Sequence, residues 1–281
     1  AYLKAHYPAE FMAAVLSNRG GFYDACVYTE EARRMNIKIL PPDINRSDEP
    51  FTAHHKTIRV GLSQIKKLKK ISLDAILNNH PYTSFADFMA RSEVSLSELE
   101  SLIRCGAFSS LGVNKAGLLW QLKLHHRPSL CKQALFAPVS LQIPKLADDS
   151  LHENLLAELE CLDLTVSGHR LNLYSLQNHK LSQTIIQGNQ LENFSGRLAT
   201  LIGWAITFKH ARTVENERMK FMTLEDATAT FEVTLFPGVY KQFGHLLYDH
   251  GPYIIRGRID PEGDSVTALW LKRLQPVERL A

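Results

Sequence analysis

Five β-rich runs in the last third of the sequence limit the possible folds more than any other feature. They span residues 197–213, 218–228, 229–237, 252–260 and 265–274. In the third run, Phe231, Val233 and Leu235 alternate with polar residues, as expected for a half-buried strand. A helical pattern, residues 238–247, stands between the third and the fourth runs. That order is typical of an OB-fold, so a five-stranded OB-fold β-barrel is predicted over residues 196–281.

The chain before the barrel has helical rather than strand periodicity. Residues 2–17 place Leu3, Tyr7 and Phe11 at helical spacing, with Pro8 in an early turn. Further helical patterns cover residues 22–37, 82–92, 95–112, 114–126 and 150–164. Together with the barrel, these patterns predict an α+β multidomain protein whose N-terminal region is all-α.

The net charge of +3 conceals a segregation of charge along the chain. Residues 51–147 hold thirteen Lys and Arg against five Asp and Glu, a net charge of +8. Residues 148–163 then hold six acidic residues and no Lys or Arg. A basic module of this kind is typical of a protein that binds a polyanion, and a solvated surface of mixed charge is the alternative.

The basic module contains the spacing of a helix-hairpin-helix motif, in residues 61–78 (GLSQIKKLKKISLDAILN). Its apolar positions are Leu62, Ile65, Leu68, Leu73 and Ile76. The turn of such a motif presents backbone N–H groups to a phosphate, but Lys67 and Lys69 stand where the motif has glycine. Either the lysines supply mobile charges in place of backbone dipoles, or the turn serves packing alone. A second, looser copy covers residues 99–119 and keeps Gly106.

Two sets of residues are candidates for DNA contacts. In the hairpin module they are Arg59, Lys66, Lys67, Lys69, Lys70, Arg104 and Lys115. In the barrel they are Trp204, Phe208, Lys209, Arg212, Arg218, Lys220 and Phe221. The barrel set surrounds the loop between the first two strands, which is one of the places where OB-folds bind single strands. For each ring, a place in the barrel core is the alternative.

Patterns for catalysis and for metal binding are missing from the sequence. It contains no D-x-D pair, no phosphate-binding loop and no nucleophile motif. The four cysteines form no C-x-x-C pair, which predicts buried, reduced thiols in a cytoplasmic protein. No apolar run reaches the roughly 20 residues of a membrane helix. We therefore expect no catalytic residue, no metal, no cofactor and no membrane span in this chain.

Seven stretches of the sequence share one resemblance. They are AYLKAHYPAEFMAAVLSN, EEARRMNIKILPPDINRS, GLSQIK, SFADFMARS, LIRCGAF, LLAELECLDLTVSGHRL and FMTLEDATATFEVTLFPGVY. In this order they resemble the C-terminal half of the bacterial DNA polymerase III alpha subunit. Two further stretches, LSNRGGFY and SLGVNKAGLLWQL, are more similar to the error-prone, damage-associated paralogue. The resemblance covers nearly the whole chain and departs from the family at Lys67 and Lys69.

The resemblance implies an order of parts. These are the end of the fingers region (1–50), a tandem helix-hairpin-helix DNA-binding module (51–147), a connector with an acidic helix (148–195) and the OB-fold domain (196–281). It also implies a parent DNA-directed DNA polymerase, a nucleotidyltransferase that uses Mg²⁺ and has its catalytic carboxylates upstream of Ala1. The chain is then expected to be a piece of a longer protein and to be inactive alone.

The expected function is non-catalytic DNA binding in replication, or in the damage-tolerant synthesis that accompanies DNA repair. The hairpin module would hold duplex DNA, and the barrel would hold single-stranded template. The further expected partners are the upstream polymerase domains and the sliding clamp or other replisome proteins. The alternative is a protein-interaction module with vestigial DNA binding, which docks through the barrel or through the acidic helix of residues 151–165.

Overall fold

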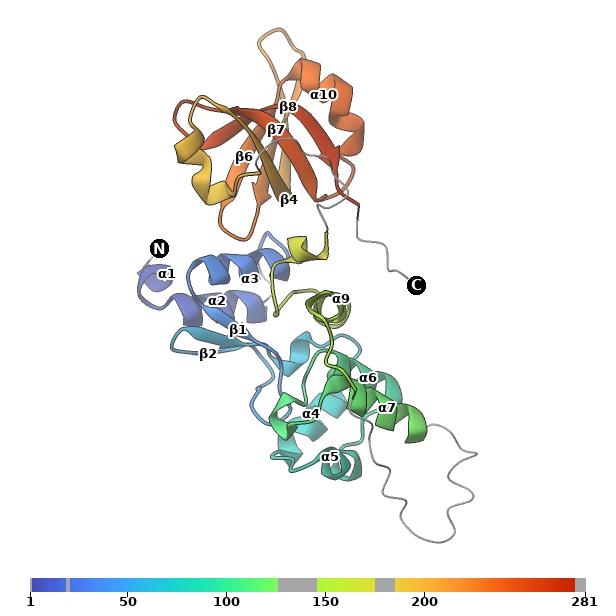
Figure 1. Ribbon diagram of the computed structural model, residues 1–281. Coiled ribbons are helices and arrows are strands. Elements are labelled where there is room, and N and C mark those ends of the chain that lie inside the picture. Colours follow the sequence, from blue (N-terminus) through green and yellow to red (C-terminus); the bar gives the residue numbers. More distant parts are fainter. Residues whose placement is uncertain (1, 19–20, 126–145, 175–184, 276–281) are drawn as a thin grey trace. The chain divides into compact units, whose positions relative to one another are not determined.

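The computed structural model describes residues 2–18, 21–125, 146–174 and 185–275 (Figure 1). The chain divides into two compact units, residues 1–168 and 169–281, and each unit is considered by itself. Residues 126–145 at the end of the predicted DNA-binding module, which include Cys131, lie outside the described residues, as do residues 175–184 of the predicted connector.

Short helices form most of the first unit. Two of them begin with a capping box, in which a serine and a glutamate three positions later satisfy each other's backbone N–H groups. The serines are Ser95 and Ser150. The α-helices are α1 (Tyr2–His6), α2 (Pro8–Asn18), α3 (Ala25–Arg34), α4 (Lys70–Asn79), α5 (Phe85–Arg91), α6 (Leu96–Arg104), α7 (Lys115–His125) and α9 (Leu151–Leu162). The 3-10 helices are η1 (Leu62–Gln64) and η2 (Ser109–Leu111).

A small three-stranded sheet lies between α3 and α4 along the chain. Strand β3 (Thr57–Arg59) is central, with β1 (Lys38–Leu40) parallel to it and β2 (Thr52–His54) antiparallel. The sequence predicted an all-α region here, because strands of three residues are too short to show a period of two. The N-terminal region is therefore helical with a small sheet added.

One apolar core joins the helices and the sheet of the first unit. It includes Met12 of α2, Ile58 of β3, Ile76 of α4, Leu102 of α6 and Leu162 of α9, each at most 1% exposed. The acidic helix α9 thus shares its core with the basic hairpin module. Burial of this common core holds the two oppositely charged segments together.

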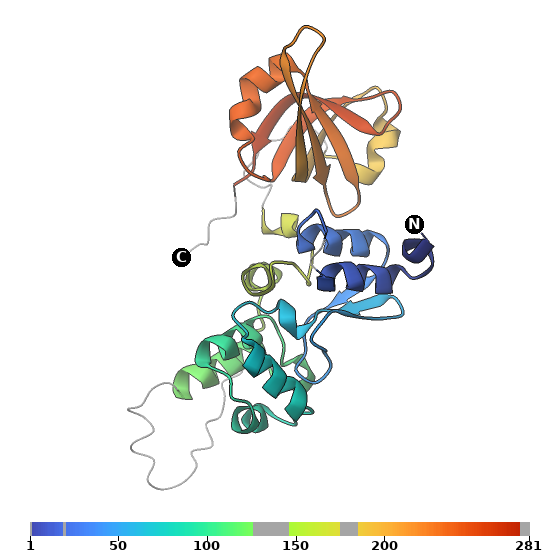
Figure 2. The ribbon, with the colours of Figure 1, turned by 180° about the vertical axis from the view of Figure 1, so that it is seen from behind.

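The second unit contains a closed barrel (Figure 2). Its strand order is β4-β5-β6-β8-β7. The strands are β4 (Leu198–Arg212), β5 (Arg218–Glu225), β6 (Thr230–Leu235), β7 (Tyr253–Ile259) and β8 (Ser265–Arg273). Helix α10 (Pro237–Phe243) lies between the third strand and the fourth, as predicted. The 3-10 helices of this unit are η3 (Arg170–Leu173), η4 (Gly188–Phe194) and η5 (Gly244–Leu246). Strand order and helix position confirm the predicted OB-fold.

Side chains alternate between the inside and the outside of the barrel. In β6, Phe231, Val233 and Leu235 are buried, while Thr230 and Glu232 are exposed, which confirms the predicted alternation. The β6–β8 pairing is parallel and closes the barrel, whereas the other strand pairs are antiparallel.

The segment that precedes the barrel is packed onto it. Arg170 of η3 donates to the Glu225 carboxylate of β5 at 2.6 Å, and both side chains are buried. The same guanidinium lies 4.4 Å from the centre of the Trp204 ring on β4. The compact unit that holds the barrel therefore extends upstream to His169.

Candidate nucleic-acid interface

The first hairpin lies between β3 and α4, and its apolar residues are buried as the motif requires. Leu62, Ile65, Leu73 and Ile76 are at most 4% exposed, and Leu68 packs partly buried against the same core. The limb before the turn is η1, a single 3-10 turn, whereas the spacing predicted a second short α-helix. The helix ends early because Ile65 takes an extended backbone, with φ −70° and ψ 115°.

Lys67 forms the turn with a left-handed backbone, at φ +68°. Glycine suits this conformation, because a side chain there costs about 1–2 kcal/mol. Lys69 has φ −74° and ψ 153°, an extended conformation open to any residue, and it is the N-cap of α4. Backbone geometry therefore calls for glycine at the first of the two substituted positions and not at the second.

Backbone donors of this turn are already used inside the fold. The Lys66 N–H donates to the carbonyl of Cys161, near the end of α9, at 2.8 Å. The Lys69 N–H donates to Oε1 of Glu98 at 2.9 Å. Groups of the protein thus take up donors that the motif would offer to a phosphate.

Glu98 is a buried carboxylate, 2% exposed, in the first turn of α6. Its Oε2 accepts from the N–H of Ser95 at 2.8 Å and from the Ser95 hydroxyl at 2.5 Å. Burial by itself would raise the pKa of Glu98, but hydrogen bonds from Ser95, Lys69 and Ser72 outweigh it and lower the pKa to about 2. Glu98 therefore stays ionised and joins the start of α6 to the start of α4.

The second hairpin keeps its glycine, and its donors are also satisfied internally. Gly106 follows α6 at φ +82°, and its N–H bonds a carbonyl in the last turn of that helix at 3.0 Å. The Ser109 hydroxyl and the Ser110 N–H both donate to Oδ2 of Asp43 at 3.0 Å. Asp43 is 1% exposed. Each hairpin therefore holds a buried carboxylate at its turn, Asp43 in the second and Glu98 in the first.

The acidic segment of residues 148–163 neutralises part of the basic module. Three of the predicted DNA contacts form surface ion pairs with it. The pairs are Lys66–Asp163 (2.5 Å), Arg104–Glu160 (2.5 Å) and Lys115–Asp149 (4.0 Å). Exposed ion pairs of this kind contribute less than about 1 kcal/mol each to stability. A phosphate can therefore compete with the acidic side chains for these Lys and Arg residues. The charge segregation seen along the sequence is partly cancelled in the fold.

The remaining predicted contacts of the module differ in how far their charge is engaged. Lys70 pairs with Glu49 at 2.8 Å and with a carboxylate one turn along α4 at 3.1 Å. Arg59 donates to a backbone carbonyl at 3.1 Å. Lys67 and Lys69 are exposed, and within the part of the chain that the structure describes neither forms an ion pair. Their ammonium groups are therefore accessible to a phosphate.

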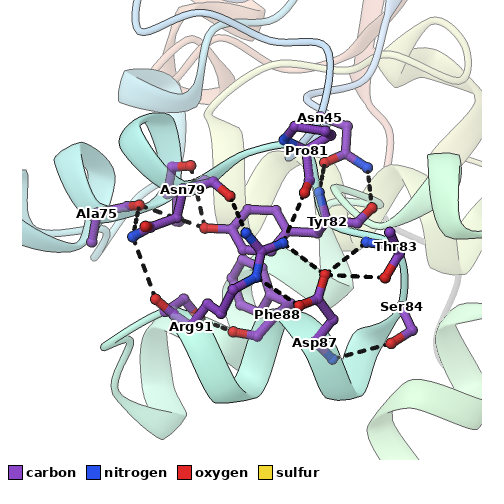
Figure 3. Close-up of polar contacts among 12 residues, drawn as sticks. Asn45, Ala75, Asn79, Pro81, Tyr82, Thr83, Ser84, Asp87, Phe88 and Arg91 are labelled. Carbon is purple, nitrogen blue, oxygen red and sulfur yellow. Dashed lines mark hydrogen bonds and ion pairs between the residues drawn. The ribbon is translucent and has the colours of Figure 1, made fainter.

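Arg91 is a surface arginine of the basic module whose donors are used within the fold (Figure 3). Its guanidinium donates to both carboxylate oxygens of Asp87 at 2.6 Å. It also donates to the carbonyls of Asn79 (2.6 Å) and Pro81 (2.8 Å), and it lies 4.6 Å from the centre of the Tyr82 ring. The guanidinium holds the pKa of Asp87 well below its usual range. Arg91 of α5 therefore stabilises the segment that joins α4 to α5.

Two of the predicted barrel contacts point into the barrel end. Lys220 is 5% exposed, and its Nζ lies 4.2 Å from the centre of the Phe208 ring and 3.5 Å from the Leu247 carbonyl. Burial lowers the pKa of the Lys220 ammonium. Phe208 packs against the barrel core. Lys220 is therefore buried away from a ligand and Phe208 is partly buried, because the strand period turns both side chains inward.

Trp204 is covered by the segment that precedes the barrel. Besides the Arg170 guanidinium, the ring of Tyr174 lies 6.0 Å away, centre to centre. Trp204 thus packs against the preceding segment, whereas Phe208 packs against the barrel core. Neither covering residue could be identified from the sequence, because no local pattern links Arg170 or Tyr174 to Trp204 on β4.

Four predicted residues remain on the surface of the β4–β5 hairpin. Lys209 stands opposite Phe221 in the strand register. Arg212 stands opposite Arg218 at the end of the hairpin. Because successive side chains alternate between faces, the two arginines share the side of Lys220, away from the first pair. The predicted residues therefore come together as two pairs on opposite sides of the hairpin.

Three further observations concern metal binding, membrane helices and cysteines in the described residues. Among them, no group of three or more His, Cys, Asp or Glu is arranged to hold a metal ion. None of the helices in the described ranges has both the length and the apolar character needed to cross a membrane. Cys26, Cys105 and Cys161 are buried thiols.

A helix-hairpin-helix region followed by an OB-fold barrel places this chain in a class defined by two modules that bind nucleic acids in many proteins. Residues 36–118 match the family model described as a helix-hairpin-helix motif. The chain is homologous to the C-terminal part of DNA polymerase III alpha subunits and error-prone DNA polymerases, which confirms the resemblance seen in the sequence.

Three relatives illustrate the homology. DNA polymerase III subunit alpha of Xylella fastidiosa is 32% identical over 292 residues, covering 92% of this chain and 24% of the relative. The subunit of Saccharopolyspora erythraea is 31% identical over 313 residues, covering 99% and 26%. The error-prone DNA polymerase of Symbiobacterium thermophilum is 28% identical over 325 residues, covering 95% and 30%. The chain thus spans about a quarter to a third of the length of these relatives.

One solved structure is similar to part of the chain at a low TM-score. A domain of replication protein A from Methanococcus maripaludis covers 33% of this chain and 97% of its own, with a TM-score of 0.29 and 12% sequence identity. The OB-fold assignment rests on the strand order and the position of α10 described above.

Proposed function

We propose that this chain is a non-catalytic, nucleic-acid-binding part of a DNA-directed DNA polymerase of the polymerase III alpha type. The hairpin module holds duplex DNA, and the barrel holds single-stranded template, during replication or damage-tolerant synthesis. The observation that carries the proposal is the homology over nearly the whole chain, which includes both modules. Nucleotidyl transfer with Mg²⁺ belongs, in this proposal, to the parts of the relatives that the chain does not span.

In the hairpin module, Lys67 and Lys69 are the first phosphate contacts. Because Glu98 and the Cys161 carbonyl already accept the turn's N–H groups, binding depends on mobile ammonium charges rather than on fixed backbone dipoles. Such contacts tolerate variation in the position of the phosphate, as a surface that follows a moving duplex requires. Lys66 and Arg104 join when a phosphate replaces their partners in the acidic segment.

In the barrel, Lys209 and Phe221 form the outer contact, with an ammonium group for a phosphate and a ring for a base. Arg212 and Arg218 stand directly opposite each other in the register, an arrangement of like charges that is unfavourable to the fold alone. A phosphate between the two arginines relieves that repulsion. This supports a role for the end of the hairpin in binding the single-strand backbone.

A salt titration of the chain with labelled duplex and single-stranded oligonucleotides, followed by fluorescence anisotropy, tests the proposal. Neutralised phosphates predict that log K falls linearly with log salt, with a slope of roughly 0.9 per phosphate on duplex and roughly 0.7 on single strands. Absence of measurable binding to either DNA at about 50 mM salt would overturn the proposal.

A second candidate function is a protein-interaction module with vestigial DNA binding. The observation that favours it is the internal use of the hairpin donors by Asp43 and Glu98. Charge reversal at all four lysines of the first hairpin discriminates between the two candidates. The lysines are Lys66, Lys67, Lys69 and Lys70. Loss of duplex affinity supports the DNA-binding function, and unchanged affinity supports the interaction module.

A further inference from the structure

The outer side of β7 and β8 carries a second group of basic and apolar side chains, on strands other than the β4–β5 hairpin. We name it the β7–β8 face, and it consists of Arg256, Arg258, Leu269, Trp270 and Lys272. The three basic side chains are exposed, Leu269 is 50% exposed, and Trp270 is partly exposed. Arg256 stands directly opposite Trp270 in the strand register.

A β-bulge in β8 places two consecutive large apolar side chains on the outside. Arg256 pairs with Trp270 and Gly257 pairs with Ala268, so Leu269 is the extra residue. The neighbours Ala268 and Leu271 are each 1% exposed and belong to the barrel core. Leu269 and Trp270 therefore both face solvent, where apolar surface beside cations indicates a binding surface.

The β7–β8 face carries no acidic residue in its strand register. The positions opposite Arg256 and Arg258 on β4 are Thr200 and Leu198, and the position opposite Arg258 on β8 is Thr267. The acidic turn of residues 260–264 bounds one end, and there hydroxyl groups of Ser265 and Thr267 already donate to the Asp260 carboxylate. Among the described residues, none of the three cations of this face forms an ion pair, although Arg258 donates to the Gly196 carbonyl at 3.0 Å.

We propose that the β7–β8 face binds single-stranded nucleic acid, with Trp270 stacked on a base and Arg256, Arg258 and Lys272 bound to phosphates. Residues two apart on a strand lie about 7 Å from each other, so Arg256 and Arg258 reach separate phosphates. A ring surrounded by cations is the arrangement that binds single strands without regard to sequence. The inference rests on the proposed function for the class of ligand. It adds a second contact surface to the same barrel, outside the strands that the proposed function uses.

The test measures binding of the full chain to a labelled oligothymidine by fluorescence anisotropy over a range of salt concentrations. Simultaneous Arg256→Glu, Arg258→Glu and Lys272→Glu should weaken binding by about tenfold or more and reduce the salt slope by about 2, at roughly 0.7 per phosphate. Trp270→Ala should weaken binding about fivefold or more at an unchanged slope, and Trp270→Phe should retain most of the affinity.

The matched control is Lys38→Glu, Arg46→Glu and Lys56→Glu, three exposed bases of the first unit, which change the net charge equally. Circular dichroism establishes that every variant is folded. If charge reversal of the β7–β8 face weakens oligothymidine binding no more than the control variant does, while the wild type binds, this inference is wrong and the proposed function stands. If the wild type binds no DNA, the proposed function fails as well. Loss of binding to a polyglutamate peptide with unchanged oligothymidine binding identifies a protein-binding surface and also overturns the inference.

Discussion

The Glu98 carboxylate on α6 accepts the Lys69 N–H at the start of α4, at 2.9 Å and across 29 positions of sequence. One buried anion therefore caps two helices. Glu98→Ala leaves buried donors without their acceptor, so we expect the free energy of unfolding to fall by about 2–4 kcal/mol. Urea denaturation followed by circular dichroism measures it. Glu98→Gln keeps one acceptor oxygen and should lose less.

The stabilisation by Glu98 should also depend on pH. Its folded pKa of about 2 lies below the unfolded value of roughly 4.3, so the stabilisation is present above pH about 4.5 and is lost as the pH falls toward 2. The difference in stability between the wild type and Glu98→Gln should shrink over that window. A difference that stays constant down to pH of about 2.5 contradicts the prediction.

Lys67 is predicted to hold the turn at a conformational cost. Lys67→Gly and Lys67→Ala both remove the ammonium group, but Ala keeps a β-carbon at φ +68°. We expect the Gly variant to be more stable than the Ala variant by about 1 kcal/mol, measured by thermal or chemical unfolding. Both variants should lose the same duplex affinity. Equal stability of the two variants would show that the left-handed backbone at this turn is not a source of strain.

The acidic segment is predicted to compete with DNA for the basic module. Combined Glu160→Gln and Asp163→Asn release Arg104 and Lys66 from their ion pairs. Duplex affinity should rise by roughly three- to tenfold at about 100 mM salt, with a steeper salt dependence.

The control for that measurement is Glu10→Gln combined with Glu93→Gln. Both are exposed acids, and the change in net charge is the same. If the control raises the affinity equally, general electrostatics explains the effect, and the local competition is absent.

Lys220 is predicted to reduce the stability of the barrel without contributing to DNA binding. Its folded pKa lies below the unfolded value of roughly 10.4, so the buried ammonium is unfavourable at neutral pH, and this cost disappears as the pH rises toward that value. Lys220→Met should raise the midpoint of thermal unfolding at pH 7, with a smaller gain near pH 10. Oligothymidine affinity should stay unchanged, whereas Lys209→Met should lower it. Equal loss of affinity in both variants contradicts the assignment.

The sequence predicted the barrel well because its signals are local. Alternation in β6, turn residues between the runs and one helical pattern were enough to order five strands and α10. The buried positions of the first hairpin, such as Leu62 and Ile76, followed from spacing in the same way. The three-residue strands β1, β2 and β3 carry no such signal, because a period cannot be read from so few residues.

The candidate site was predicted less completely, since its contacts join distant segments. The Ser95-x-x-Glu98 spacing is typical of a capping box. However, no pattern in the sequence predicts the hydrogen bond from the Lys69 N–H to Glu98. The acidic composition of residues 148–163 is evident, while its pairing with the basic module depends on how α9 packs. Lys220 was selected by composition, and the strand period that turns it inward emerges once the register with β4 is known.

The contact of Arg170 with Glu225 and Trp204 also has a mechanical consequence. Tension applied along the chain toward the barrel reaches this buried contact before it reaches the hydrogen bonds of β4. A pull on the preceding segment would therefore detach η3 before it broke the hydrogen bonds of β4, the first strand of the barrel.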